Sequence, residues 1–388
     1  MMLTNQDIIF LSGIRWKFSQ QRHQHLASLF SQRNRVLFVE MALSPANLLK
    51  DAGTTMSHWK DWTRGVREIQ PNLFLYTAPP TLPMGRSFLS INMLNQHFIF
   101  RSVNKAMRRV GMNKPIFWIS DPYFSFFARN HGQILTIYDW IHDNPVRNRS
   151  KIDQTYRELE KEVIGKTDII FTPSRFIYDK YGKSDTFFHL VSHGVDYDLF
   201  EESGGKPPEE MEQFPLPVIG FIGTIGSTVD IDLLEILAGE REKWSFVFIG
   251  DVRRELGRLR SCPNIHFLGS RPEPELPRYL RCFSAGIIPY VVSPATRTVH
   301  PVKTYEYLAA GIPVVSTRLP ELEHMRGMIE LAAGPDEFII SLEKVLREDT
   351  PKLHQKRSRF ARENSWESRM QTIERIIEEL INPSLDQS

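Results

Sequence analysis

The chain has 388 residues, 41% of them hydrophobic and 24% charged, and a net charge of +2. This length exceeds one ordinary core and predicts two domains of about 190 residues, in a soluble globular protein. The apolar runs end before the ~18 residues that a membrane helix needs, no signal peptide is expected, and two cysteines match no metal spacing or disulfide framework. We therefore expect a cytoplasmic protein.

The small net charge hides an asymmetry between the two halves of the chain. Residues 1–195 contain 25 Lys and Arg against 15 Asp and Glu, whereas residues 196–388 contain 23 against 31. A basic first half suits an anionic membrane surface, a lipid-phosphate acceptor or nucleic acid, and scattered charge that only keeps the domain soluble is an equal alternative. No nucleic-acid-binding motif accompanies the excess, so we expect no nucleic acid partner.

The N-terminal part of the chain begins with a strand at 8–14, a helix at 19–31 and a strand at 35–40. Because a tight Gly turn follows the first strand, the pattern predicts the start of a doubly wound sheet. Arg15, Trp16 and Arg22 follow that turn and either face a cleft or serve packing and solvation.

An irregular segment at 41–87, rich in Pro, Trp and Met, is either a flap that touches an acceptor or a membrane, or part of the domain's own core. The helix expected at 88–110 carries basic residues at helical spacing, which form a solvated face or a membrane anchor. Three strands are expected after it, at 115–120, 134–138 and 168–172.

Three ionisable residues, Asp139, His142 and Asp143, follow the second of these strands. A carboxylate or imidazole at the carboxyl end of a buried strand could orient or deprotonate an acceptor hydroxyl. The alternative is a polar loop in which Asp143 or Asn144 caps the next helix.

Residues 201–217 are acidic and rich in Gly and Pro, which indicates an exposed linker. The strand that follows and its loop contain glycines at the spacing GxxGxxG, which is a weak signal by itself. One alternative is an NAD-type Rossmann enzyme in which Asp251 binds the ribose of the cofactor. Asp230-Ile-Asp232 is formally a metal-binding DxD pattern, but Asp230 stands where a helix cap belongs. We expect no metal site.

The segment 285–317 predicts one βαβ unit, with strands at 285–290 and 312–317 and a helix of about three turns from Pro301. Lys303 and Glu306 share a face of this helix. A cation in the first turn meets the positive end of the helix dipole and unpaired N–H groups, so a phosphate would stabilise it there. An ordinary solvated Lys–Glu pair is the alternative.

The run "HPVKTYEYLAAGIPVVSTRLPEL" resembles the signature region of nucleotide-sugar-dependent glycosyltransferases of the GT-B fold, in particular glycosyltransferase family 4 and its bacterial envelope-polysaccharide members. "TPSRFIYDKY" and "SHGVDYDLF" are also similar to the family. The resemblance implies an α/β protein with two Rossmann-like doubly wound domains facing a central cleft. The expected division is an acceptor domain at 1–195, a linker at 196–217, a donor domain at 218–365 and a helix at 366–388 that crosses back.

The resemblance also assigns roles to residues. Lys303 is expected on the donor diphosphate and Glu306 on the ribose, and the stretch containing Asp139, His142 and Asp143 is expected to form the acceptor wall. The expected catalytic residues are Asp139, His142, Asp143 and Lys303. The expected donor-binding residues are Gly223, Thr224, Gly250, Asp251, Ser270, Arg271, Arg297, Lys303, Thr304 and Glu306.

Two departures from the family pattern bear on catalysis. Thr298 stands where many members carry a second glutamate, and the Gly223 loop lacks the usual basic residue, so Arg297 and Lys303 must supply more of the charge. The resemblance implies metal-independent transfer with retention, no cofactor, and a glycan or lipid-linked acceptor, with the protein cytoplasmic or peripheral on the membrane. A nucleotide-sugar-binding protein without turnover is the alternative.

Overall fold

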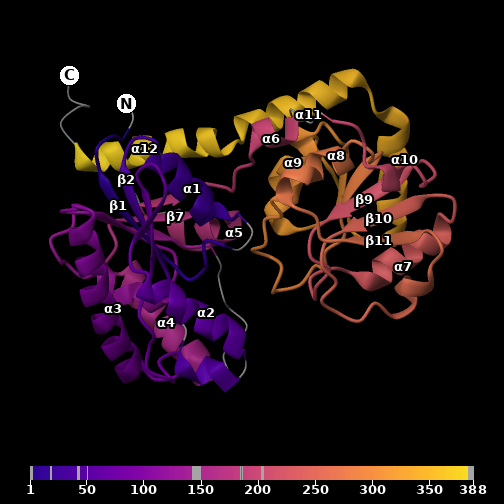
Figure 1. Ribbon diagram of the computed structural model, residues 1–388. Coiled ribbons are helices and arrows are strands. Elements are labelled where there is room, and N and C mark those ends of the chain that lie inside the picture. Colours follow the sequence, from indigo (N-terminus) through magenta and orange to yellow (C-terminus); the bar gives the residue numbers. More distant parts are fainter. Residues whose placement is uncertain are drawn as a thin grey trace, which may run out of the picture. The chain divides into compact units, whose positions relative to one another are not determined.

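A computed structural model gives the structure of the protein and describes residues 3–17, 20–41, 44–49, 51–141, 150–183, 185, 187–201 and 205–382. The chain forms two compact units (Figure 1). Unit 1 comprises Met1–Ser192 with Met370–Ser388, and unit 2 comprises His193–Arg369. Among the helices of the described residues, none combines the length and the apolar character needed to cross a bilayer.

In the described part of the chain, the sheet of unit 1 has eight strands in the order β3-β4-β2-β1-β5-β6-β7-β8. They are β1 Asp7–Ser12, β2 Arg35–Glu40, β3 Arg67–Gln70, β4 Leu73–Thr77, β5 Ile116–Ile119, β6 Leu135–Asp139, β7 Ile169–Thr172 and β8 Phe188–Leu190. β3 runs antiparallel to β4, and the other neighbours are parallel. Because β1 lies between β2 and β5, the direction of strand addition reverses between β1 and β5, where such sheets bind ligands.

The helices of unit 1 cover both faces of this sheet. In the described chain they are α1 Arg22–Ser31, α2 Ala52–Thr63, α3 Leu89–Arg109, α4 Lys151–Ile164, α5 Arg175–Ile177 and, from Met370 onward, α12 Trp366–Ile381, with short turns η1 Pro45–Leu49, η2 Pro122–Ala128 and η3 Tyr178–Gly182. Ile99 and Val103 of α3 belong to the core that includes Ile9 and Leu11 of β1. Phe30 of α1 packs on the other face, against Phe10 of β1 and Trp118 of β5, because successive side chains of a strand point to opposite faces of the sheet.

In the described chain, the sheet of unit 2 has six strands in the order β11-β10-β9-β12-β13-β14, and all neighbours are parallel. They are β9 Val218–Ile222, β10 Ser245–Ile249, β11 Ile265–Gly269, β12 Ala285–Ile288, β13 Val314–Thr317 and β14 Glu330–Ala332. Strand addition reverses between β9 and β12. The loops that follow these two strands therefore lie at the point of the sheet where a ligand is expected.

The helices of unit 2 divide between two buried clusters. They are α6 Tyr197–Glu201, α7 Ile231–Glu240, α8 Leu276–Leu280, α9 Lys303–Ala309, α10 Pro335–Glu348, α11 Pro351–Glu363 and the start of α12 Trp366–Ile381, with turns η4 Glu209–Met211, η5 Gly257–Ser261, η6 Glu273–Glu275 and η7 Pro320–Met325. Side chains of α8, α9 and α11 share one cluster with the sheet, and side chains of α7 and α10 share the other. The sheet is thus a layer between helices, as expected of a doubly wound fold.

Three segments differ from what the sequence predicts. Residues 201–217 are not wholly an exposed linker, because Met211 is buried in the core of unit 2. The helix expected from Pro301 begins at Lys303 and has seven residues, so it is shorter than three turns. The helix after β6 is capped by Ser150, whose hydroxyl accepts from the N–H of Asp153, while Asp143 and Asn144 lie outside the described residues.

Candidate active site

The first turn of α9 places Lys303 beside Glu306, in unit 2. The Lys303 Nζ lies 3.1 and 3.0 Å from the two carboxylate oxygens of Glu306. The Glu306 side chain is buried, whereas 28% of the Lys303 side chain remains exposed. An ammonium has three donors, so the amine can bind an anion and keep its contact with the carboxylate.

The backbone at the start of α9 corrects one expectation. The N–H groups of Thr304 and Tyr305 donate to the carbonyls of Pro301 and Val302, at 3.1 and 2.9 Å. These first-turn amides are therefore not the unpaired donors that the sequence suggested for a diphosphate. The positive charge at this end of α9 comes from the Lys303 side chain.

Thr304 is fully buried, and its Oγ1 atom has no hydrogen-bond partner among the described residues. A buried hydroxyl without a partner is normally satisfied by water or a ligand. The contact of Thr304 with a donor therefore stays a prediction.

The glycine loop after β9 is packed against the end of β10. Gly223 and Gly250 have φ values of 146° and 149°, which other residues rarely adopt. A Cβ atom on Gly250 would lie 2.0 Å from the Gly223 carbonyl oxygen. The Gly223 N–H donates to Ile249 at 2.8 Å and the Gly250 N–H donates to Gly269 at 2.9 Å, so these two amides are used within the protein.

The loops after β9 and β12 meet at the reversal point of the sheet. Asp230 N–H donates to the Pro289 carbonyl at 2.7 Å, and Val291 N–H donates to Thr228 at 2.8 Å. The Tyr307 hydroxyl of α9 accepts from the N–H of Ile222, the last residue of β9, at 2.7 Å. These bonds hold the glycine loop, the loop that leads to α9 and α9 itself in one corner of unit 2.

The other expected donor-binding residues surround this corner. Thr224, Asp251 and Ser270 are exposed and Arg297 is partly exposed. The Asp251 carboxylate lies 3.1 Å from Arg253 in a surface ion pair. Asp251 also contributes its carbonyl to the N–H of Ile225 at 2.9 Å, so it helps to fix the glycine loop.

Arg271 is held by other parts of unit 2. Its Nε donates to the Tyr279 hydroxyl at 2.8 Å, and its Nη2 donates to Glu210 at 3.0 Å. Hydrogen bonds from Tyr279 and then Arg271 hold the pKa of the Glu210 carboxyl below its usual value. The Arg271 side chain therefore fastens η4 to α8, and its backbone remains the part that can meet a nucleotide base.

Glu273, at the start of η6, is a further carboxyl on which the charges of Glu306 and Lys303 act, and the sequence did not single it out. Burial first, and the negative charge of Glu306 second, raise the pKa of the Glu273 carboxyl, while Lys303 lowers it. Its position two residues after Arg271, at the carboxyl end of β11, is the signal that could have indicated it.

In unit 1, Asp139 is part of a buried ion pair. Its two carboxylate oxygens lie 3.0 and 2.9 Å from Nε of Arg22, and both side chains are almost fully buried. Arg22 Nη1 also donates to the carbonyls of Val191 and Ser192. The prediction that Asp139 deprotonates an acceptor is therefore corrected: a carboxylate held by a guanidinium and closed off from solvent has a structural role.

The remaining residues predicted in unit 1 separate into two groups. Arg15 pairs with Asp61 at 2.7 Å, and the N–H of Trp16 donates to Glu40 at 2.8 Å, so the turn after β1 is held by neighbouring side chains. His142 and Asp143 lie outside the described residues.

Comparison with known proteins identifies the family. Residues 217–348 match the model of the group 1 glycosyl transferases. The chain is 30% identical over 275 residues to TuaH of Bacillus subtilis (strain 168), named as a teichuronic acid biosynthesis glycosyltransferase, with 64% of this chain and 68% of that protein covered. This chain belongs to the group 1 glycosyltransferases.

Solved structures confirm the fold of this glycosyltransferase. Sucrose-phosphate synthase from Thermosynechococcus elongatus superposes with a TM-score of 0.70 at 13% identity, over 98% of this chain and 100% of that one. HepE from Anabaena, solved with UDP and glucose, gives a TM-score of 0.61 at 15% identity, over 96% and 99%. The predicted GT-B class, with two doubly wound α/β domains, is confirmed.

The family match in this glycosyltransferase covers the corner of unit 2 built around Lys303 and Glu306. It removes the alternative of an NAD-type Rossmann enzyme. Asp230 caps α7 by accepting from the N–H of Leu233 at 3.0 Å, as predicted. Among the described residues, no three His, Cys, Asp or Glu side chains are grouped so as to hold a metal ion.

Proposed function

We propose that this glycosyltransferase belongs to family 4 and moves a sugar from a nucleotide diphosphate-sugar to a hydroxyl of a glycan or lipid-linked acceptor in cell-envelope polysaccharide synthesis. The group 1 match and the likeness to TuaH support this assignment. The observation that carries it is the Lys303–Glu306 pair, a partly exposed amine on a buried carboxylate at the carboxyl edge of the unit 2 sheet.

In this proposal each group of the donor has a chemical partner in unit 2. Lys303, with Arg297, neutralises the diphosphate, and Glu306 accepts hydrogen bonds from the ribose hydroxyls. Gly223, Thr224 and Gly250 let the backbone approach the phosphates, and the segment from Ser270 meets the base. The complexes of HepE with UDP and glucose and of the E. coli trehalose-6-phosphate protein with UDP-2-fluoro glucose support a nucleotide donor of this kind.

The chemistry of the proposed step is electrostatic. The bond from the anomeric carbon to the diphosphate breaks while the acceptor oxygen bonds to the same face of the sugar, as retention in one step requires, and negative charge develops on the departing diphosphate. A fixed amine near that charge stabilises the transition state more than the ground state. We propose that transfer proceeds with retention and without a metal or cofactor, and that His142 or Asp143 receives the acceptor proton.

Unit 1 offers a surface that suits an anionic membrane. Along the exposed face of α3, Leu94 and Phe98 are followed by Arg101, Lys105 and Arg108 at helical spacing. Leu94 and Phe98 are 54% and 56% exposed. Apolar side chains beside basic ones favour the interface of an anionic bilayer, so we propose a cytoplasmic protein peripheral to the inner membrane face.

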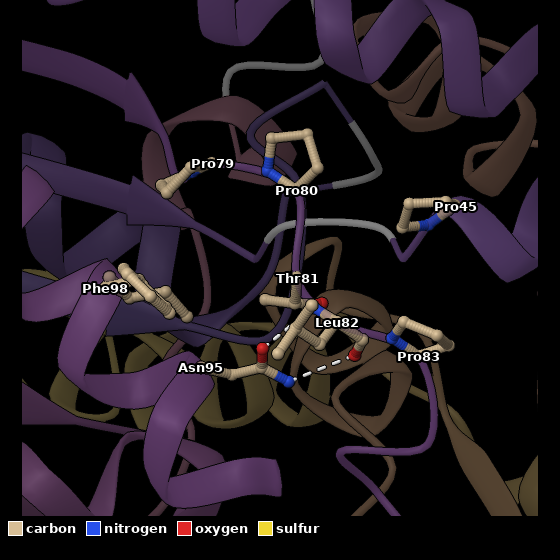
Figure 2. Close-up of a pocket in the computed structure, with 9 residues that line it drawn as sticks. Pro45, Pro79, Pro80, Thr81, Leu82, Pro83, Asn95 and Phe98 are labelled. Carbon is tan, nitrogen blue, oxygen red and sulfur yellow. Dashed lines mark hydrogen bonds between the residues drawn. The ribbon is translucent and has the colours of Figure 1, made fainter.

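A groove beside this face adds apolar surface (Figure 2). It has a volume of about 260 Å³ and lies between Phe98 of α3 and the proline-rich segment that contains Pro79, Pro80 and Pro83. Asn95 fixes one wall, because its side chain bonds the N–H of Leu82 at 2.8 Å and the carbonyl of Leu82 at 3.1 Å.

A silent nucleotide-sugar-binding protein is the second candidate, because buried Thr298 replaces the second glutamate of many relatives. Incubation with UDP- and GDP-sugars and envelope extract separates the two. Transfer or hydrolysis supports the enzyme, whereas donor binding without any turnover supports the silent protein. No change in melting temperature with any nucleotide sugar would refute both, since a ligand at 100 times its Kd stabilises by about 2.7 kcal/mol.

A further inference from the structure

A second hollow in unit 1 lies at the reversal point of its sheet. It has a volume of about 290 Å³, and Arg86, Asp121, Tyr123, Asp153, Tyr156 and Arg157 are among its lining residues. Asp121 follows β5, and its carboxylate lies against the turn after β1: a Cβ atom on Gly13 would be 2.3 Å from Asp121 Oδ2. The hollow therefore stands at the carboxyl ends of β1 and β5, where open α/β sheets bind ligands.

The polar groups in this hollow are incompletely paired. Tyr123 is 7% exposed, and its hydroxyl has no hydrogen-bond partner among the described residues. Asp121 Oδ1 accepts from the N–H of Tyr123 at 2.9 Å, while no described group donates to Oδ2. A buried hydroxyl without a partner costs free energy and is normally satisfied by water or a ligand.

The two arginines are also available. The Arg86 guanidinium lies 5.3 Å from the centre of the Tyr123 ring, and Arg157 bonds only the Asp153 carbonyl, at 3.4 Å. The charge of Arg86 acts on the Asp121 carboxyl. The remaining guanidinium donors of both arginines can bind a ligand or solvent.

The composition of the hollow indicates which ligand fits. Two guanidinium groups and two carboxylates, those of Asp121 and Asp153, balance in charge, so a bare phosphate gains little there. Carboxylates accept hydrogen bonds from pairs of sugar hydroxyls, and guanidinium groups donate hydrogen bonds to the hydroxyl oxygens. The rings of Tyr123 and Tyr156, with centroids 5.8 Å apart and planes at 71° to each other, offer apolar surfaces to the C–H groups of a sugar. A volume near the lower limit of ligand pockets suits one sugar ring.

We propose that this pocket binds one sugar unit of the acceptor, so that the acceptor is a glycan recognised by its hydroxyls rather than a bare lipid phosphate. This inference rests on the proposed function. Asp121 and Tyr123 are then acceptor-binding residues.

The test uses the full chain and saturation-transfer NMR with methyl glycosides of glucose, galactose, N-acetylglucosamine, N-acetylgalactosamine and glucuronic acid, and with inorganic phosphate. We expect at least one glycoside to bind, and Tyr123→Phe and Asp121→Asn each to weaken it at least tenfold. Tyr181→Phe, which removes an exposed phenol of unit 1, should leave it unchanged. Binding of phosphate alone, or glycoside binding that survives both substitutions, overturns the inference.

Donor binding, measured by calorimetry, separates this inference from the proposed function. Tyr123→Phe and Asp121→Asn should leave nucleotide-sugar affinity within twofold of the unsubstituted protein and raise the acceptor KM at least tenfold. If the unsubstituted protein binds no nucleotide sugar, the proposed function fails. If it binds the donor but no glycoside, only the sugar pocket is wrong. The Tyr123→Phe substitution removes a single oxygen atom and keeps the packed ring, so we expect this variant to fold. The test therefore remains valid even if the Asp121→Asn variant does not fold.

Discussion

At the scale of single residues, the Lys303 amine has the strongest claim to a ligand. Its contact with Glu306 positions it, since the carboxylate is buried and the amine is partly exposed. An amine held in this way loses little entropy when an anion binds. The same geometry makes Glu306 both a structural partner and a group that remains able to accept from hydroxyls.

We predict that Lys303→Ala weakens nucleotide-sugar affinity at least tenfold, about 1.4 kcal/mol, and abolishes transfer. Lys344→Ala is the matched control, because that lysine pairs with Glu330 at 2.7 Å on the surface of the same unit. Isothermal titration calorimetry measures both variants. Equal affinities in the two would show that α9 does not hold the diphosphate.

His58 of α2 gives a prediction about pH. Burial, and then the positive charge of Arg15, lower the pKa of His58 to about 4. The folded protein thus binds fewer protons here than the unfolded chain, whose histidine titrates near 6.5, and stability falls as the pH drops from 6.5 toward 4.

We expect His58→Gln to reduce the loss of unfolding free energy between pH 7 and pH 5 by about 1 kcal/mol, a value lowered from the full shift to allow for screening. Urea denaturation at the two pH values measures this difference. An identical pH dependence in both proteins would mean that the pKa of His58 does not differ between the folded and unfolded states.

At the scale of elements, the Arg22–Asp139 pair joins the start of α1 to the end of β6. The two residues are 117 positions apart, and Arg22 also holds the backbone at Val191 and Ser192. The pair therefore fixes three segments at the carboxyl edge of the unit 1 sheet. Removing one partner leaves an unpaired buried charge.

We predict that Arg22→Met and Asp139→Leu each destabilise unit 1 by about 3–5 kcal/mol, and that the double variant costs less than the sum. Thermal and urea unfolding of the three variants measure the coupling. A stable Asp139→Leu variant with a changed pH profile of transfer would instead restore Asp139 as a catalytic group.

The contact between the loops after β9 and β10 depends on Gly250. Its positive φ and the nearby Gly223 oxygen leave no room for a Cβ atom. Gly239 of α7 contrasts with it, because apart from its chain neighbours and the nearby backbone of its own helix no described atom lies within 4 Å of an added Cβ, and its backbone is helical.

We therefore expect opposite effects on the free energy of unfolding. Gly250→Ala should cost about 3 kcal/mol or more and weaken donor binding, whereas Gly239→Ala should stabilise by about 0.5–1 kcal/mol. Differential scanning calorimetry with and without a nucleotide sugar distinguishes them. A Gly250→Ala protein as stable as the unsubstituted one would contradict the packing of these loops.

At the scale of the whole molecule, the excess of basic residues belongs to the first half of the chain, and the exposed face of α3 adds Leu94 and Phe98 to it. An anionic bilayer attracts the charges, and the apolar side chains then enter the interface. The attraction of the basic residues and the burial of the apolar side chains both favour membrane binding, so the loss of either should reduce membrane binding.

We predict that the protein sediments with vesicles containing anionic lipid and less with neutral vesicles, and that high salt releases it. The double variant Leu94→Gln/Phe98→Gln should bind at least tenfold more weakly. Ile236→Gln, which alters an exposed apolar residue of α7 in unit 2, is the control. Salt-insensitive binding, or none, would remove the membrane from the proposal.

The sequence alone determined the features that depend on short-range patterns. Apolar runs and Gly and Pro signals predicted the βαβ segments, and a spacing of three residues predicted that Lys303 and Glu306 share a face. The structure confirms the doubly wound sheets and the contact between these two side chains. Such features follow from the sequence because one helix or one strand contains all of the groups involved.

Only the tertiary structure decided which distant groups meet. In the tertiary structure Asp139 pairs with Arg22, and the Gly223 N–H donates to the carbonyl of Ile249. The charge of Glu306 acts on the Glu273 carboxyl, and the Asp121 carboxylate lies against Gly13. Burial and pairing determine whether a carboxylate is structural or available to a ligand, and both depend on strand order. Strand order is a long-range property that the local pattern of residues does not contain.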